Sequence, residues 1–217
     1  MRSRAISALV LAALGLGCYD KGNAVYLKAL EKVGMEKRDV LVKRVKHTKE
    51  AQEEAQEQFR DALEEFQAMV DYDGGELEKQ YEKLRSEYED SADKAEEVHR
   101  RISGIEKVSD KLFKEWQSEL EAYQDPDLRR ASEQQLTDTR RRSADLIATM
   151  KQAAATMDPV LQQLEERVLF LKHNLNAQAL GSLQQSSDAL QQDVTALISE
   201  MQKSIAEADR FIAEMNA

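Results

Sequence analysis

Residues 77–116 read LEKQYEKLRSEYEDSADKAEEVHRRISGIEKVSDKLFKEW, and core-type side chains recur in this stretch in steps of four and three. The members of this ladder are Leu77, Tyr81, Leu84, Tyr88, Ser91, Ala95, Val98, Ile102, Ile105, Ser109, Leu112 and Trp116. Such spacing places them along one stripe of an α-helix, which is the heptad pattern of a coiled coil. A helix cannot bury so long a stripe alone, so the neighbouring segments must supply the partner surfaces.

Three further ladders with the same spacing lie on either side. They are Leu41, Val45, Thr48, Gln52, Ala55, Phe59, Ala62, Phe66 and Met69; Leu146, Met150, Ala153, Met157, Leu161, Leu164, Val168, Leu171 and Leu175; and Leu183, Ser187, Leu190, Val194, Leu197, Met201, Ser204, Ala208, Phe211 and Met215. Each predicts a long amphipathic helix. A shorter helix is expected over residues 24–33, before Gly34.

Turn signals separate the ladders. Residues 73–75, Asp-Gly-Gly, tolerate positive φ and predict a tight turn after a first helix that ends near Tyr72. The second helix should stop near Tyr123, because Asp125 and Pro126 supply an N-cap and a first-turn proline for the third. A last turn is expected within residues 173–181.

Pro159 leaves two alternatives, the start of a new helix or a kink in a continuing one. The ladder passes through it in register, and a turn after residue 173 gives arms of similar length. Both observations favour the kink.

The composition agrees with long helices. Two prolines, eight glycines and a charged fraction of 33% are typical of helical and coiled-coil chains, and runs suited to strands are absent from the sequence. The predicted fold is therefore all-α: an elongated antiparallel bundle of about four long helices with coiled-coil heptad packing, about 70 Å long.

The N-terminus has the features of an export signal. Arg2 and Arg4 precede an apolar run, residues 5–17, that is too short to span a bilayer. Cys18, the single cysteine, stands at the expected cleavage point in a setting that resembles the bacterial lipobox. We therefore expect a signal peptide at 1–17, a lipidated tether at 18–23 and one helical domain at 24–217. The alternative is an ordinary signal peptide with an incidental cysteine.

Lipidation would place the protein in a bacterial cell envelope. A palmitate-bearing Cys18 with further acyl chains is sufficient for stable membrane anchoring. Because Tyr19 stands where inner-membrane lipoproteins tend to have Asp, the resemblance implies the periplasmic face of the outer membrane.

Four segments resemble a family of bacterial coiled-coil lipoproteins filed as a domain of unknown function. They are Glu36–Val42, Ala51–Ala55 running to Phe59, Phe66–Gly75 with Glu78–Tyr81, and Val168–Ala177. The resemblance covers nearly the whole mature chain. It implies no activity, because the family has none assigned.

The sequence offers little catalytic machinery, so we expect no enzyme, no cofactor and no metal. Of His47, His99 and His173, only His99 has a metal-like spacing, to Glu96, and a di-iron bundle needs a second Glu-x-x-His pair. Trp116 belongs to the core ladder. The arginine runs at 129–130 and 140–142 fan around a helix, so we expect solvated surface and no nucleic acid as a partner.

Charge is distributed unevenly. Residues 21–49 contain nine Lys or Arg and three Asp or Glu, a net charge of +6, whereas residues 50–98 contain five and eighteen, a net charge of −13. We expect Lys37, Arg38, Lys43, Arg44 and Lys46 to face anionic lipid head groups.

These patterns favour a non-enzymatic, lipid-anchored scaffold or adaptor that acts through helix-mediated contact with an envelope protein or a second copy. The alternative is a carrier that binds a hydrophobic or lipid ligand between loosely packed helices.

Overall fold

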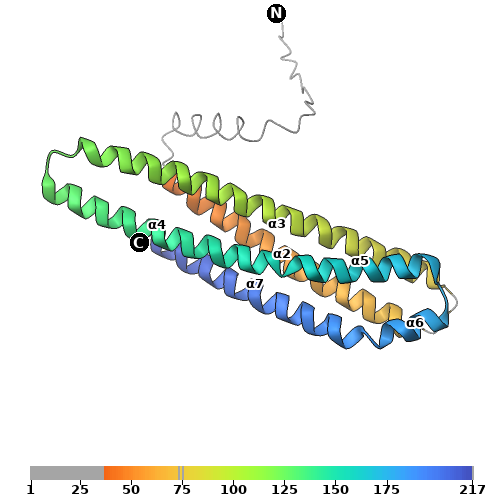
Figure 1. Cartoon of the computed structure of the whole chain (residues 1–217). Coiled ribbons are helices and arrows are strands. Elements are labelled where there is room, and N and C mark those ends of the chain that lie inside the picture. Colours follow the sequence, from red (N-terminus) through yellow and green to blue (C-terminus); the bar gives the residue numbers. More distant parts are fainter. Residues whose placement is uncertain (1–36, 73, 75, 217) are drawn as a thin grey trace, which may run out of the picture. The chain divides into compact units, whose positions relative to one another are not determined.

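The computed structural model describes residues 37–72, 74 and 76–216, and every element within these ranges is helical (Figure 1). The helices are α2 (Lys37–Val70), α3 (Leu77–Glu119), α4 (Pro126–Ala155), α5 (Met157–His173), α6 (Ala177–Gln184) and α7 (Ser187–Asn216), with a short 3-10 helix η1 (Leu120–Ala122) after α3. The all-α prediction is thus confirmed for the described residues. The predicted signal peptide, tether and helix at 24–33 lie outside them.

The arms of the bundle run antiparallel. Ion pairs join Glu54 to Lys94 and Glu65 to Lys83, so the residue number falls along α3 as it rises along α2. α7 runs opposite to α2, as the contacts Lys49–Asp209 and Gln67–Gln191 show. α4 and α5 run opposite to α3, through Glu106–Lys151 and His99–Asp158. α7 also runs opposite to α4, through Arg142–Glu214 and Gln152–Glu200. In the described part of the chain, α2, α3, α4 with α5, and α6 with α7 therefore form four adjoining arms.

The predicted ladders supply the core. All nine ladder residues of α2 are buried. In α3 the ladder is buried from Tyr81 to Ser109 except at Tyr88, which is partly exposed. In α7 it is buried from Leu190 to Phe211. The helical periodicity thus identified the inward faces correctly.

Thr156 interrupts the third arm. The favoured prediction of one kinked helix is wrong in detail, because α4 ends at Ala155 and α5 begins at Met157. Pro159 stands in the first turn of α5, where the missing backbone N–H leaves no helical hydrogen bond unmade. The arm nevertheless continues in the same direction (Figure 1). The predicted ladder is buried on both sides of the break except at Leu161, where Val160 is buried instead, and at the last position, Leu175.

The fourth arm is also divided, which corrects the prediction of about four long helices. α6 ends at Gln184 and α7 begins at Ser187. The guanidinium of Arg167, on α5, donates a hydrogen bond to the carbonyl oxygen of Ser186 at 3.3 Å. This contact comes from another arm, so the local pattern gave no sign of the break.

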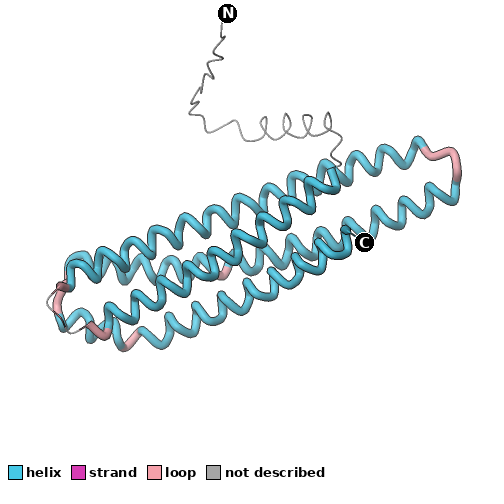
Figure 2. Tube along the Cα trace, turned by 180° about the vertical axis from the view of Figure 1, so that it is seen from behind, coloured by secondary structure: helices cyan, strands magenta, loops and turns pink. Residues whose placement is uncertain are grey.

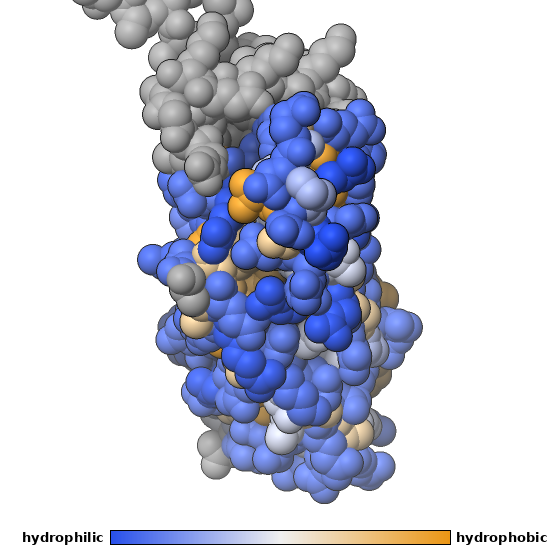
Figure 3. Space-filling view, turned by 90° about the vertical axis from the view of Figure 1, so that its left-hand side faces the viewer, coloured by the Kyte–Doolittle hydropathy of each residue, from blue (hydrophilic) through white to orange (hydrophobic). Residues whose placement is uncertain are grey.

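The α3–α4 hairpin extends past the other arms. Arg38 donates to the carbonyl of Met215, so α2 begins where α7 ends, while α3 and α4 continue to their own turn (Figure 2). Beyond this level, Phe113, Leu120 and Leu136 form a separate small core cluster. Asp125 caps α4 as predicted, accepting from two backbone N–H groups. Seen from this end, the surface is mostly hydrophilic with small, separate hydrophobic spots (Figure 3).

Candidate functional site: the basic half of the bundle

The five predicted basic residues lie in the first three turns of α2. Arg38, Lys43 and Lys46 are exposed, and Lys37 and Arg44 are half-buried. Their orientation toward a membrane stays a prediction. Cys18, the predicted lipidation site, lies outside the described residues.

Antiparallel packing brings a second set of cations beside them. The end of α3 from residue 100 to 114 contains five Lys or Arg against two acids, and α2 from 37 to 49 contains six against one. α4 adds four against one between residues 140 and 151. We call these three segments the basic half of the bundle. Sequence reasoning missed the α3 segment, because its cations gain significance only beside those of α2.

The opposite half is acidic. Between residues 50 and 70, α2 carries one Arg and seven acids, and between residues 77 and 97, α3 carries four bases and eight acids. α7 adds two acids and no base between residues 187 and 199. The bundle is therefore polarised along its length, with opposite net charge in its two halves.

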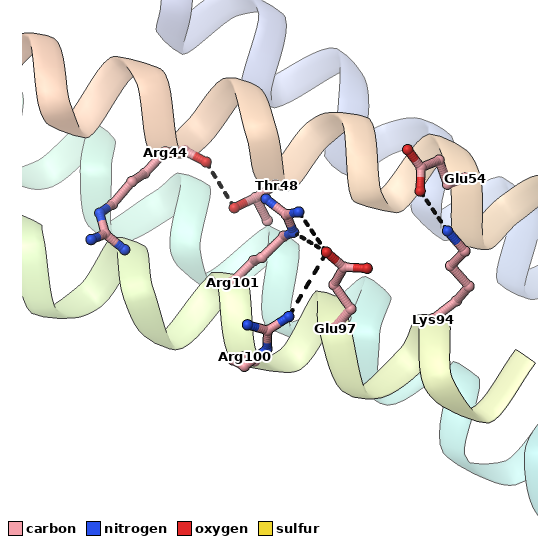
Figure 4. A network of polar contacts seen from close by, with 7 residues as sticks. All are labelled: Arg44, Thr48, Glu54, Lys94, Glu97, Arg100 and Arg101. Carbon is pink, nitrogen blue, oxygen red and sulfur yellow. Dashed lines mark hydrogen bonds and ion pairs between the residues drawn. The ribbon is translucent and has the colours of Figure 1, made fainter. Parts of the chain in front are cut away.

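Glu97 lies at the boundary between the halves (Figure 4). Its carboxylate accepts a hydrogen bond from Nε of Arg101 at 2.8 Å and lies 3.9 Å from Arg100. The hydrogen bond to Arg101 is the main cause that lowers the pKa of Glu97. Arg100 and Arg101 of α3 therefore share this one carboxylate, whereas the guanidinium of Arg44 on α2 lies apart from it (Figure 4).

On the α7 side of the basic half, acidic side chains compensate more of the positive charge. Lys49 bonds to Asp209 at 2.8 Å, and this hydrogen bond is the main cause that raises the pKa of Lys49. Arg142 pairs with Glu214, also at 2.8 Å. Acids on α7 therefore offset part of the charge of α2 and α4, and the excess lies on the α2–α3 side.

A match to a family model assigns the chain to a protein family. It matches residues 26–215, nearly all of the sequence, and its description is "Protein of unknown function (DUF2959)". The chain is a member of this family. No curated protein and no solved structure matches it.

No metal-binding constellation is found in this DUF2959 chain within the described ranges, since no group of three or more His, Cys, Asp or Glu residues is placed to hold an ion. His99 lies with Nε2 3.4 Å from Asp158 of α5, and both side chains are largely exposed. The sequence gave no signal for this pair, because it depends on the register between α3 and α5. None of the described helices is both long and apolar enough to cross a bilayer.

Trp116 takes the structural role predicted for it. Its indole N–H donates to the hydroxyl of Ser132 at 2.9 Å, across the α3–α4 hairpin. Among the tyrosines of the ladder, Tyr81 is buried and Tyr88 is partly exposed.

A groove of about 540 Å³ runs between α3 and α4 in the basic half. Phe113, Ala144, Ile147 and Ala148 supply its apolar lining, and charged side chains stand around it. The sequence did not indicate this groove, because its two walls come from separate helices. The apolar lining gives this family member a surface that can receive an apolar group.

Proposed function

We propose that this DUF2959 protein is a non-enzymatic, lipid-anchored scaffold or adaptor of the bacterial cell envelope. The charge polarity of the bundle is the observation that supports the proposal. A rod with one basic and one acidic half has a built-in preference for how it meets a charged surface and a charged partner. In this proposal the outer faces of the helices bind another protein, and no reaction is catalysed.

The anchor is Cys18, diacylated on its thiol and acylated on the amino terminus that removal of residues 1–17 exposes, with outer-membrane residence implied by Tyr19. Three acyl chains together hold a protein stably, because each buried methylene contributes about 0.8 kcal/mol. The tether at 18–23 keeps the bundle near the membrane.

The arms pack as a heptad coiled coil in this proposal. Support comes from the buried ladder and from its buried polar members: the hydroxyl of Ser204 on α7 is 3.0 Å from Oε1 of Gln52 on α2. A polar pair at a seam position fixes register at some cost in stability.

Orientation follows from the basic half. Lys37, Arg38, Lys43, Arg44 and Lys46 rest against anionic head groups, and the acidic half with the α2–α3 turn points away toward a protein partner. Each Lys or Arg near an anionic surface contributes about 1 kcal/mol within a Debye length of about 8 Å. This interaction orients an anchored rod and is too weak to anchor it.

Reversal of charge tests the orientation. We expect the full-length variant Lys43→Glu/Arg44→Glu/Lys46→Glu to stay in the membrane fraction but to broaden the distance between the bilayer and a fluorophore attached near Gly74. A matched control reverses three exposed acids of the other half, Glu57→Lys/Asp61→Lys/Glu64→Lys. Equal distance distributions for wild type and basic-half variant, at low and high salt, would refute the orientation.

Partner contact is tested by in-cell cross-linking from a photoreactive residue at Glu82, which is exposed in the acidic half. A defined protein adduct, including a second copy, supports the scaffold.

The groove between α3 and α4 favours the alternative, a carrier of a hydrophobic or lipid ligand. Mass spectrometry of the purified protein that finds a stoichiometric lipid, together with no protein adduct, would favour the carrier.

A further inference from the structure

The groove between α3 and α4 lies where small side chains meet in the seam between the two helices. Ser109 and Ser143 oppose each other there, with their hydroxyl oxygens 3.0 Å apart. Both are buried, and each fills less space than a Leu or Ile would. Outside this pair, Ala144 and Ala148 are exposed and carry no side-chain atom beyond Cβ. The helices therefore leave a groove over the serine pair that a ligand can fill.

The lining of the groove suits a hydrocarbon chain. Phe113 supplies apolar surface at the end near the α3–α4 turn, and Ile147, which is half-buried, lies farther along α4. Ala144 and Ala148 complete the apolar wall on α4. A ligand that covers these side chains removes apolar surface from water, which is favourable.

The groove has the length of one acyl chain. Its α3 wall, from Glu106 to Lys114, is about 12 Å long, and its α4 wall, from Arg140 to Lys151, is about 17 Å long, at about 1.5 Å per residue. The hydrocarbon core of a bilayer is about 30 Å thick, so the chains of one leaflet span about 15 Å. The groove volume of about 540 Å³ also lies within the range of small-molecule pockets, about 300–1,000 Å³. A single acyl chain therefore matches the groove in length.

Positive charge is in excess at the end of the groove near the α3–α4 turn. Lys114 and Arg140 border this end, and both are exposed. The guanidinium of Arg140 lies over the ring of Phe113 at 5.6 Å and donates a hydrogen bond to the backbone carbonyl of Phe113 at 3.4 Å. Asp110, one turn before Lys114, offsets one of the two positive charges. One net positive charge therefore remains at this end.

The opposite end of the groove is neutral, because Lys151 pairs there with Glu106. The helix segments around the groove add positive charge. Residues 100–114 of α3 contain five bases and two acids, and residues 140–151 of α4 contain four bases and one acid. This distribution attracts an anionic head group to the turn end and leaves an apolar tail to run toward Lys151.

We propose that this groove binds one long-chain fatty acid, with its carboxylate between Lys114 and Arg140 and its hydrocarbon chain over Ala144 and Ala148. A guanidinium donates two parallel hydrogen bonds to a carboxylate, and the single negative charge of the ligand equals the excess charge at this end. A neutral lipid would fill the groove without meeting that charge. The inference goes beyond the proposed scaffold function and does not depend on it. It gives the alternative carrier function a site and a ligand class.

Photolabelling tests the site and the direction of the ligand, with the full-length protein reconstituted in phosphatidylcholine vesicles. The probes are two palmitic acid analogues, one with a diazirine next to the carboxyl group and one with a diazirine near the chain end. Mass spectrometry of the digested protein should find the first probe on residues 113–114 or 140–144, and the second on residues 106–109 or 147–151. An excess of palmitic acid should remove both adducts. A hexadecanol analogue with a diazirine near its chain end has no charge and should label the groove about tenfold less.

A variant with a filled groove tests whether the space itself is needed. Ala144→Leu/Ala148→Leu places larger side chains in the groove and should reduce labelling by either acid probe about tenfold or more. Both positions are exposed and Leu is a good helix former, so the bundle should stay folded, which circular dichroism verifies. The matched control, Ala196→Leu/Ala206→Leu, changes two exposed alanines of α7 and should label like wild type.

A charge variant tests the head-group contact. Lys114→Gln/Arg140→Gln should weaken labelling by the acid about tenfold and leave labelling by the alcohol unchanged. A structural defect would lower both. The matched control, Arg129→Gln/Arg130→Gln, removes two exposed arginines in the first turns of α4, outside the groove, and should change neither.

The inference is overturned if the adducts fall outside the two walls of the groove, if the filled groove labels as well as wild type, or if the acid and the alcohol label equally. A protein adduct from the acidic half together with no labelling of the groove overturns the fatty acid site and leaves the scaffold function standing. Labelling of the groove by the acid, in the expected direction and with no protein adduct, supports the site and favours the carrier over the scaffold.

Discussion

Arg167 allows a quantitative test of how the arms are joined. It is 8% exposed, stacks on Phe66 at 5.4 Å and donates hydrogen bonds to the carbonyls of Gln163 and Ser186. Burial lowers its pKa, which means that the charged form is held at a cost. One side chain therefore connects α5, α2 and the α6–α7 break, while its charge is poorly solvated.

Replacing Arg167 by Ala and by Met separates the contribution of its contacts from the cost of its buried charge. Arg167→Ala loses a cation–π contact of about 1 kcal/mol, two charged hydrogen bonds of about 1.5 kcal/mol each and the packing of the stem. We expect a net loss of about 2–3 kcal/mol after the relieved desolvation is subtracted, or a fall of about 4–12 °C in Tm. Arg167→Met keeps the stem and removes the buried charge, so we expect a loss of less than about 1 kcal/mol.

Urea unfolding followed by far-ultraviolet circular dichroism measures these values. A double-mutant cycle with Phe66→Leu should show about 1 kcal/mol of coupling to Arg167. The reasoning would be refuted if Arg167→Met destabilised the protein as much as Arg167→Ala, or if Phe66 and Arg167 proved independent.

The other predictions concern the core, the boundary between the halves and the anchor. Replacing both members of the buried pair, Gln52→Leu with Ser204→Ala, should raise the free energy of unfolding by about 1 kcal/mol, because Nε2 of Gln52 has no hydrogen-bond partner among the described residues and no buried hydroxyl is then left without its acceptor. A lower free energy of unfolding in denaturant would contradict this. Glu97 has a pKa below its ordinary 4.5, chiefly through Arg101, so its stabilising contribution should be present above that pH and disappear as the pH falls through the lowered value. Glu97→Gln should therefore be less stable than wild type at neutral pH and equal in strong acid, and a constant difference across pH titration would count against the ion pair. Cys18→Ser should abolish incorporation of radiolabelled palmitate, and equal labelling would defeat the lipid anchor.

The sequence by itself determined the helices and their inward faces. Helical periodicity is local, so the spacing from Leu77 to Trp116 identified a stripe that does not depend on what covers it. Local capping is equally readable: Asp125 and Pro126 start α4 as expected, because both act on the N–H groups of the same turn. The unequal distribution of charge along the chain could also be read from the sequence, because it is a count of residues within each segment.

Tertiary structure decided the rest. The cations at residues 100–114 join those of α2 only through the antiparallel register, and the groove needs walls from both α3 and α4. The break before Ser187 is accompanied by a hydrogen bond from Arg167, a residue on another arm. Such features arise from many weak contacts between residues far apart in sequence, and no single segment encodes their sum. A local pattern therefore fixes which face of each helix turns inward, whereas the assembled bundle fixes which outward-facing side chains become neighbours.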